Sequence, residues 1–114
     1  MKLTGKVIRG MGLGYKTANL KIDNAAQLDN LADGVYLARV SYQNNIYPAI
    51  AVKGIRPDLE VYLLDFEGDL YGQILEVDIL EKMRELIKFE KEEELLKQIN
   101  EDIREARNYF KNLA

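Results

Sequence analysis

The stretch LADGVYLARVSYQNNIYPAIAVKG, residues 31–54, contains two apolar-rich runs joined by a short polar turn. Both runs are rich in β-branched and aromatic residues, which favour strands. Asn44 and Asn45 tolerate the positive φ that a hairpin turn requires, and Pro48 predicts an edge or a bulge in the second strand. The stretch therefore predicts a β-hairpin.

Similar runs on both sides of this hairpin predict more strands. TGKVIRG (4–10) is typical of a short strand closed by glycine, and ANLKI (18–22) adds another. The runs at 59–66 and 70–80 predict a second pair across the acid-glycine-acid turn Glu67-Gly68-Asp69. Short strands at this spacing favour a closed antiparallel barrel, which removes exposed edges.

In the last segment the spacing of apolar residues changes. From Lys91 on, apolar residues fall at steps of three and four, which predicts one amphipathic helix packed on the barrel. Its acidic start, EKEEE (90–94), is interpreted as a solvated first turn favoured by the helix dipole. We expect a single domain over residues 1–114, with the barrel at about 1–88 and the helix at about 90–112.

Composition excludes several classes of site. The 114 residues contain neither cysteine nor histidine, which excludes disulfides, thiolate or imidazole metal sites and Ser-His-Asp catalysis. Any acid–base catalysis would therefore depend on carboxylates. No segment reaches the roughly 18 to 20 apolar residues of a membrane span, and no apolar leader opens the chain, so we expect a cytoplasmic protein without a membrane partner.

Charge is distributed unevenly. Residues 1–57 carry eight basic side chains against three acidic ones, a net charge of +5, so the remainder carries −8 of the total −3. The basic stretch GMGLGYKTANLKID (10–23) has three glycines among its first five residues. Glycine-rich backbone in a positive field suits an anionic ligand such as a nucleotide polyphosphate. Aromatic and basic residues do not interleave as they do in proteins that bind single-stranded nucleic acid, so no nucleic-acid partner is expected.

In order and spacing, these segments resemble the riboflavin kinases, including the kinase module of bifunctional riboflavin kinase/FAD synthetases. The resemblance runs nearly end to end through GKVIRG (5–10), LGYKTANL (13–20), GVYLARV (34–40), GIRP (54–57), EVYLLDFEGDLYG (60–72) and MRELIKFEKEEELLKQINEDIREAR (83–107). It implies a mainly β fold, a six-stranded antiparallel Greek-key barrel with a C-terminal α-helix. It also implies an enzyme that phosphorylates riboflavin to FMN with ATP and Mg²⁺, releasing ADP. We expect this enzyme to be a monomer.

The resemblance also implies roles for individual residues. Thr17 and Asn19 match the family's Pro-Thr-Ala-Asn motif, whose threonine and asparagine hold the metal and the nucleotide phosphates. Glu60 matches the carboxylate that acts as base on the ribityl 5′-hydroxyl. Arg84 matches a family arginine in the loop that closes over the flavin, and Glu85 beside it is a further candidate for substrate binding. Further nucleotide contacts are expected from a glycine-rich turn, with one lysine adding charge: Gly10, Gly12, Gly14 and Lys16.

Alternatives stay open at this point. Asp65 and Asp69 compete with Glu60 for the role of base. The stretch before Thr17 is shorter than in the family, Lys16 replaces the motif's proline, and only Asp58-Leu59 separates GIRP from Glu60. These differences leave open a kinase that uses CTP, or a non-catalytic flavin- or nucleotide-binding regulatory module. Because the chain begins at its barrel, we expect no adenylyltransferase activity.

Overall fold

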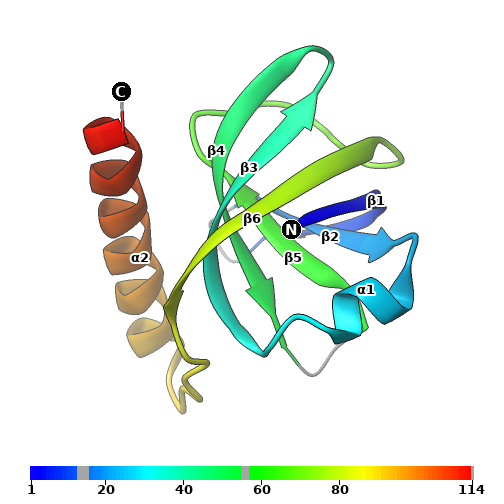
Figure 1. Ribbon diagram of the computed structural model, residues 1–114. Coiled ribbons are helices and arrows are strands. Elements are labelled where there is room, and N and C mark those ends of the chain that lie inside the picture. Colours follow the sequence, from blue (N-terminus) through cyan, green and yellow to red (C-terminus); the bar gives the residue numbers. More distant parts are fainter. Residues whose placement is uncertain (13–15, 55–56, 114) are drawn as a thin grey trace.

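Six antiparallel strands close into a barrel, and one long helix lies against its outside (Figure 1). The computed structural model describes residues 1–12, 16–54 and 57–113. Around the barrel the strand order is β1-β2-β5-β4-β3-β6. The strands are β1 (Lys2–Gly12), β2 (Lys16–Ile22), β3 (Gly34–Tyr42), β4 (Asn45–Lys53), β5 (Leu59–Leu63) and β6 (Ile74–Arg84). The predicted six-stranded antiparallel barrel is confirmed.

The order of the strands is that of a Greek key. Strands β3, β4 and β5 are consecutive neighbours, and β6 returns to pair beside β3. The predicted hairpin between residues 59–66 and 70–80 is therefore wrong: β5 pairs with β2 and β4, whereas β6 pairs with β1 and β3. Between them the chain turns at residues 64–65 and 71–72 and bends at Gly68, so Glu67-Gly68-Asp69 is not the tight hairpin turn that was predicted.

The β3–β4 hairpin closes one residue earlier than predicted. Tyr42 pairs with Asn45, so the two turn residues are Gln43 and Asn44, with φ of 48° and 64°. Two successive residues at positive φ give the turn the twist that a two-residue hairpin favours. Glutamine in the first of these positions was not anticipated, because asparagine adopts positive φ more readily.

Alternation along the strands produces two separate cores. Leu59, Val61 and Leu63 point into the barrel, whereas Glu60 and Tyr62 between them point outward. The barrel interior is filled by side chains from all six strands. A second cluster joins the outer face of β3, β4 and β6 to the helix and includes Val35, Leu37, Ile50, Leu64 and Ala106.

Helix α2 (Glu92–Leu113) confirms the predicted C-terminal helix, and Figure 1 shows it running alongside the barrel wall. Three glutamates lie in its first turn, where the helix dipole favours negative charge. None of the helices in the described part of the chain is long and apolar enough to cross a membrane. A short helix, α1 (Ala25–Asp29), was not predicted; the Asn24 side chain caps it by accepting a hydrogen bond from the Gln27 N–H at 3.2 Å.

Gly5 lies in β1 at a point where the backbone of the neighbouring strand β2 approaches closely. A Cβ added there would lie 2.6 Å from the carbonyl oxygen of Lys21, which belongs to the backbone and cannot rotate away. We expect Gly5→Ala to lower the free energy of unfolding by about 1–3 kcal/mol, as overpacking does elsewhere. Urea unfolding measures this change. Gly72→Ala is the comparison variant. A Cβ added there has no atom within 4 Å, but φ at Gly72 is 80°, so this variant measures backbone strain without a steric clash.

Candidate functional site

The register of β2 against β5 brings the predicted site residues together. Asn19 lies opposite Glu60, and Thr17 lies opposite Tyr62. Directly opposed residues share one face of a sheet, with Cβ atoms about 4.5–5.5 Å apart. Because Ala18 and Leu20 point into the barrel, all four residues belong to its outer face. Asn19 is fully buried, and Thr17 and Glu60 are half-buried.

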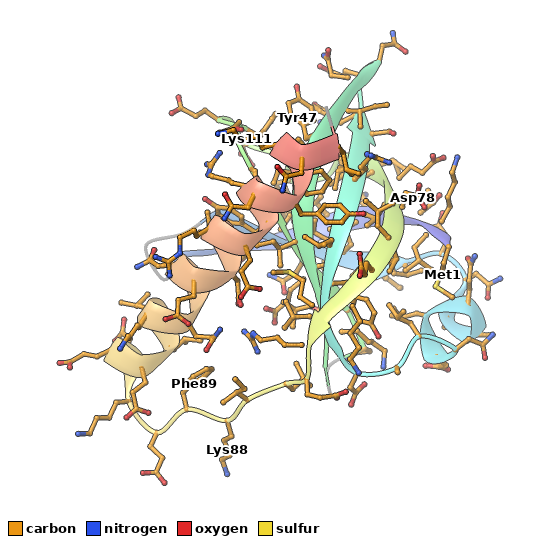
Figure 2. All side chains as sticks on the ribbon, turned by 60° about the vertical axis from the view of Figure 1, so that its left-hand side comes forward. Met1, Tyr47, Asp78, Lys88, Phe89 and Lys111 are labelled. Atoms are coloured by element: carbon orange, nitrogen blue, oxygen red, sulfur yellow. The ribbon has the colours of Figure 1, made fainter. Side chains whose placement is uncertain are left out.

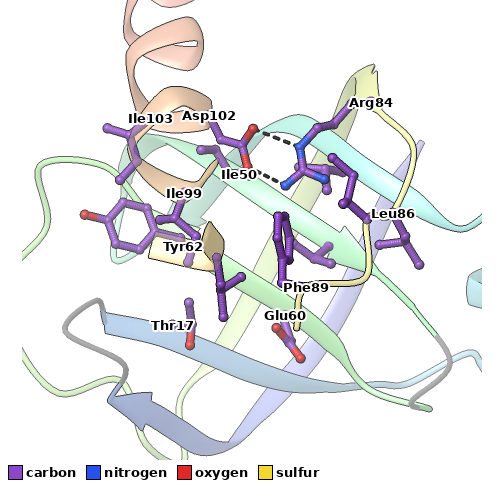
Figure 3. A pocket seen from close by; sticks show the side chains of 14 residues that line it. Thr17, Ile50, Glu60, Tyr62, Arg84, Leu86, Phe89, Ile99, Asp102 and Ile103 are labelled. Carbon is purple, nitrogen blue, oxygen red and sulfur yellow. Dashed lines mark hydrogen bonds and ion pairs between the residues drawn. The ribbon is translucent and has the colours of Figure 1, made fainter. Parts of the chain in front are cut away.

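A pocket of about 200 Å³ opens beside these residues. It has three walls: the outer face of the barrel, one side of α2, and the connection from β6 to α2 (Figure 3). Its lining is mainly apolar and comes from the barrel (Val35, Ile50, Val52, Tyr62), the connection (Leu86, Ile87, Phe89) and α2 (Leu95, Ile99, Ile103). Thr17 and Glu60 line one end.

At the opposite end of the pocket, Arg84 and Asp102 form an ion pair (Figure 3). The guanidinium donates to the carboxylate twice, from Nε to Oδ1 at 2.9 Å and from Nη2 to Oδ2 at 2.7 Å. Gln98 Nε2 donates to Oδ1 at 3.1 Å. Asp102 is only 5% exposed, so this charge is balanced within the protein.

Asp102 was missed by sequence reasoning. It lies between Ile99 and Ile103 on the apolar stripe that was used to predict the helix. An acidic residue at that place in the pattern is itself a signal, because a buried carboxylate requires a partner. Nothing in the sequence alone identified that partner as Arg84, eighteen residues earlier.

Glu85 does not line the pocket, although the resemblance implied a contact with substrate. Its side chain is exposed and accepts a hydrogen bond from Lys82 Nζ at 2.5 Å, and its backbone carbonyl accepts one from Arg84 Nη1 at 3.0 Å. The hydrogen bond to Glu85 raises the pKa of Lys82. Glu85 thus joins the end of β6 to the connection that follows.

The glycines were expected in a loop, but two of them belong to a strand. Gly10 pairs with Ala18 and Gly12 pairs with Lys16, so β1 continues past the predicted end. Gly14 and the side chain of Lys16 lie outside the described part of the structure, and their predicted contacts with phosphate stay predictions.

The two competing carboxylates lie elsewhere. Asp65 forms an ion pair with Arg107 Nη1 at 2.8 Å, and Asp69 accepts a hydrogen bond from the Tyr71 backbone N–H at 2.9 Å. Neither lines the pocket. Of the three candidate bases, Glu60 alone is on its wall.

The oxygen groups around Glu60 suit a metal that arrives with a ligand. Within residues 1–12, 16–54 and 57–113, no three acidic side chains gather into a cluster that would hold an ion alone. Thr17, which lines the pocket, offers a hydroxyl, and Asn19 carries a fully buried amide on the same face of β2. Mg²⁺ takes hard oxygen ligands, keeps several waters and is commonly held by one or two protein groups plus substrate phosphates. The residues present fit such an ion.

Comparison with known families agrees with this geometry. Residues 1–110 match the family model described as flavokinase, riboflavin kinase. The chain belongs to the riboflavin kinase family. The match covers the barrel and nearly all of α2, so it includes every wall of the pocket.

Individual relatives are longer than this member of the riboflavin kinase family. A bifunctional riboflavin kinase/FMN adenylyltransferase from Buchnera aphidicola subsp. Acyrthosiphon pisum is 37% identical, over 95% of this chain and 38% of the relative. The crystal structure of riboflavin kinase from Trypanosoma brucei has a TM-score of 0.74 and 25% identity, covering 96% of this chain and 76% of that one. A crystal structure of a macrolide-efflux protein from Streptococcus pneumoniae has a TM-score of 0.82 and 30% identity, over 94% and 38%.

Proposed function

We propose that this chain is a riboflavin kinase that transfers the γ-phosphoryl group of ATP to the 5′-hydroxyl of riboflavin, giving FMN and ADP. The observation that carries the proposal is that Thr17 and Glu60 line one end of an apolar pocket, with Asn19 paired to Glu60 on the same face of the sheet. The chain's membership of the riboflavin kinase family supports it.

The pocket suits the acceptor. Its walls are mainly apolar and include Tyr62 and Phe89, which favours a flat aromatic ring system such as that of a flavin. Leu86 and Ile87 are 40% and 49% exposed, which leaves this side partly open to a ligand that extends beyond the enclosed volume. A flavin bound here would direct its ribityl chain toward Glu60.

Glu60 would act as the general base. Its carboxylate accepts the proton of the 5′-hydroxyl as that oxygen bonds to the γ-phosphorus and the bond from phosphorus to the β-γ bridging oxygen breaks. The position of Glu60 on β5, paired with β2 and β4, holds the carboxylate on a rigid element. Phosphoryl transfer depends mainly on such positioning and on neutralisation of charge.

Thr17 and Asn19 would bind the phosphate end of ATP together with Mg²⁺. The ion would neutralise charge on the transferred group. The hydroxyl of Thr17 and the amide of Asn19 would fix the phosphates on the face that carries Glu60. The donor and the acceptor would thus meet at one end of the pocket.

The activity is tested directly by incubating the protein with riboflavin, Mg²⁺ and either ATP or CTP, and detecting FMN by chromatography. We expect FMN with ATP and none when EDTA removes the metal. FMN formed only with CTP would correct the donor while leaving the reaction intact. Quenching of riboflavin fluorescence without turnover under either donor would contradict the kinase proposal and favour a binding module.

The same proposal covers the partners. We expect the protein to work as a monomer on riboflavin and ATP without nucleic acid or a membrane, and with Mg²⁺ as the metal. Size-exclusion chromatography with light scattering tests the first expectation. Substitution of Mn²⁺ or Zn²⁺ in the assay tests the last.

A further inference from the structure

We propose that the Arg84–Asp102 pair is a clamp that sets the shape of the acceptor pocket, and that Asp102 is a positioning residue rather than a group that binds substrate. This inference rests on the proposed function only for the identity of the ligand. Arg84 was expected to contact the flavin; the contacts around it favour a different role.

The clamp joins the end of β6 to the third turn of α2, on either side of the connection that forms one pocket wall. Arg84 is the last residue of β6, and Asp102 lies in the third turn of α2. Between them the chain leaves the barrel at Glu85 and enters α2 at Glu92, without regular secondary structure between those two residues. This connection carries Leu86, Ile87 and Phe89 of the pocket lining, and Figure 2 shows Phe89 on it, near the start of α2. The ion pair spans the two elements from which this wall is suspended.

The start of the connection is fixed twice more. Arg84 Nη1 donates to the backbone carbonyl of Glu85, and Lys82 Nζ donates to its side chain. Together with the two bonds to Asp102, the guanidinium makes three described interactions inside the protein. Three of the five N–H groups of the guanidinium are thus used inside the protein, and loss of the match to Asp102 would leave that buried carboxylate with its charge unbalanced.

Stability alone does not account for the pair. A buried ion pair is expensive to desolvate, and replacement by apolar residues of similar volume is often neutral or stabilising. On its pocket side this pair has apolar neighbours, with Ile99 and Ile103 on the same helix as Asp102 and Val35 paired with Arg84 across the strands. What the pair adds over apolar packing is direction, because two parallel hydrogen bonds fix both distance and orientation.

The test replaces the pair by apolar residues in the double variant Arg84→Met/Asp102→Leu. We expect its melting temperature to stay close to that of the wild type, because the apolar replacement keeps the packing. We expect Kd for riboflavin, measured by fluorescence quenching, and KM for riboflavin to rise about tenfold, with a much smaller change in kcat.

A matched control removes another described ion pair of α2, which it makes with the turn after β5. Arg107 and Asp65 form an exposed pair away from the pocket, and Arg107→Met/Asp65→Asn breaks it while asparagine keeps the positive φ of 59° at position 65. We expect wild-type Kd and KM in this control. A comparable loss of riboflavin affinity in the control would overturn the clamp, since the effect would then follow from loosening α2 in general.

Other outcomes are equally decisive. A folded double variant that binds riboflavin with wild-type Kd overturns the clamp. If the double variant does not fold, Asp102→Asn decides the question, because it keeps the size of the side chain and removes only its charge; an unchanged Kd again overturns the proposal. If the wild type binds riboflavin without producing FMN, the kinase proposal fails while Kd still judges the clamp. A wild type that does not bind riboflavin overturns both.

Discussion

Replacing Glu60 with glutamine is expected to lower kcat for FMN formation by about 10³-fold, within the range that general base catalysis contributes. The amide cannot accept the proton of the 5′-hydroxyl, but it has nearly the same size and shape as the carboxylate. Glu60 is half-buried on the outer face of β5, so strand pairing and the barrel core are unaffected. Kd for riboflavin, measured by fluorescence quenching, is therefore expected to stay close to the wild-type value.

Two further variants make this prediction specific. Glu81→Gln changes an exposed glutamate on β6 that does not line the pocket, and should leave kcat unchanged. Asp65→Asn removes the carboxylate that competed for the role of base, and should also leave kcat unchanged because Asp65 lies against Arg107. A Glu60→Gln enzyme with wild-type turnover, or an Asp65→Asn enzyme without turnover, would show that the base has been misassigned.

The fold was predictable as far as local patterns determine it. Alternation in LEVYL (59–63) indicates which residues enter the core, and α2 follows from its three-and-four spacing. The partner of each strand is less accessible. An acid-glycine-acid turn between two apolar runs suggested that β5 and β6 pair, but the chain crosses to the other side of the barrel instead. Which strands pair to close the barrel depends on contacts between residues far apart in the sequence, and a turn sequence does not specify those contacts.

In the site, too, some features follow from the sequence and others only from the structure. The two-residue spacing of Thr17 and Asn19 predicts that they share a face of an extended strand. That Glu60 lies on this same face depends on the register between β2 and β5, which only the structure supplies. The pocket itself forms where α2 and the connection before it pack on the outside of the barrel. This is why Asp102 could be recognised as a helix residue but not as the partner of Arg84.

Replacing Thr17 with valine is expected to lower kcat/KM for ATP with Mg²⁺ by about 100-fold, the effect of losing one oxygen group from a metal and phosphate site. Valine keeps the branched shape that β2 packs, and only the hydroxyl is lost. Thr17 lines the end of the pocket that Glu60 also lines, and the apolar lining residues are unchanged in this variant. Kd for riboflavin is therefore expected to change by less than about threefold, a fraction of the binding free energy.

The matched variant Thr17→Ser separates loss of the hydroxyl from altered packing. Serine keeps the oxygen and removes the methyl group, so it should retain most of the wild-type activity, whereas valine should require a higher Mg²⁺ concentration to reach half-maximal rate. Both curves come from the FMN assay at fixed ATP with increasing Mg²⁺. If valine and serine give the same rate and the same dependence on Mg²⁺, the hydroxyl does not bind the ion. The nucleotide would then have to be held without this side chain.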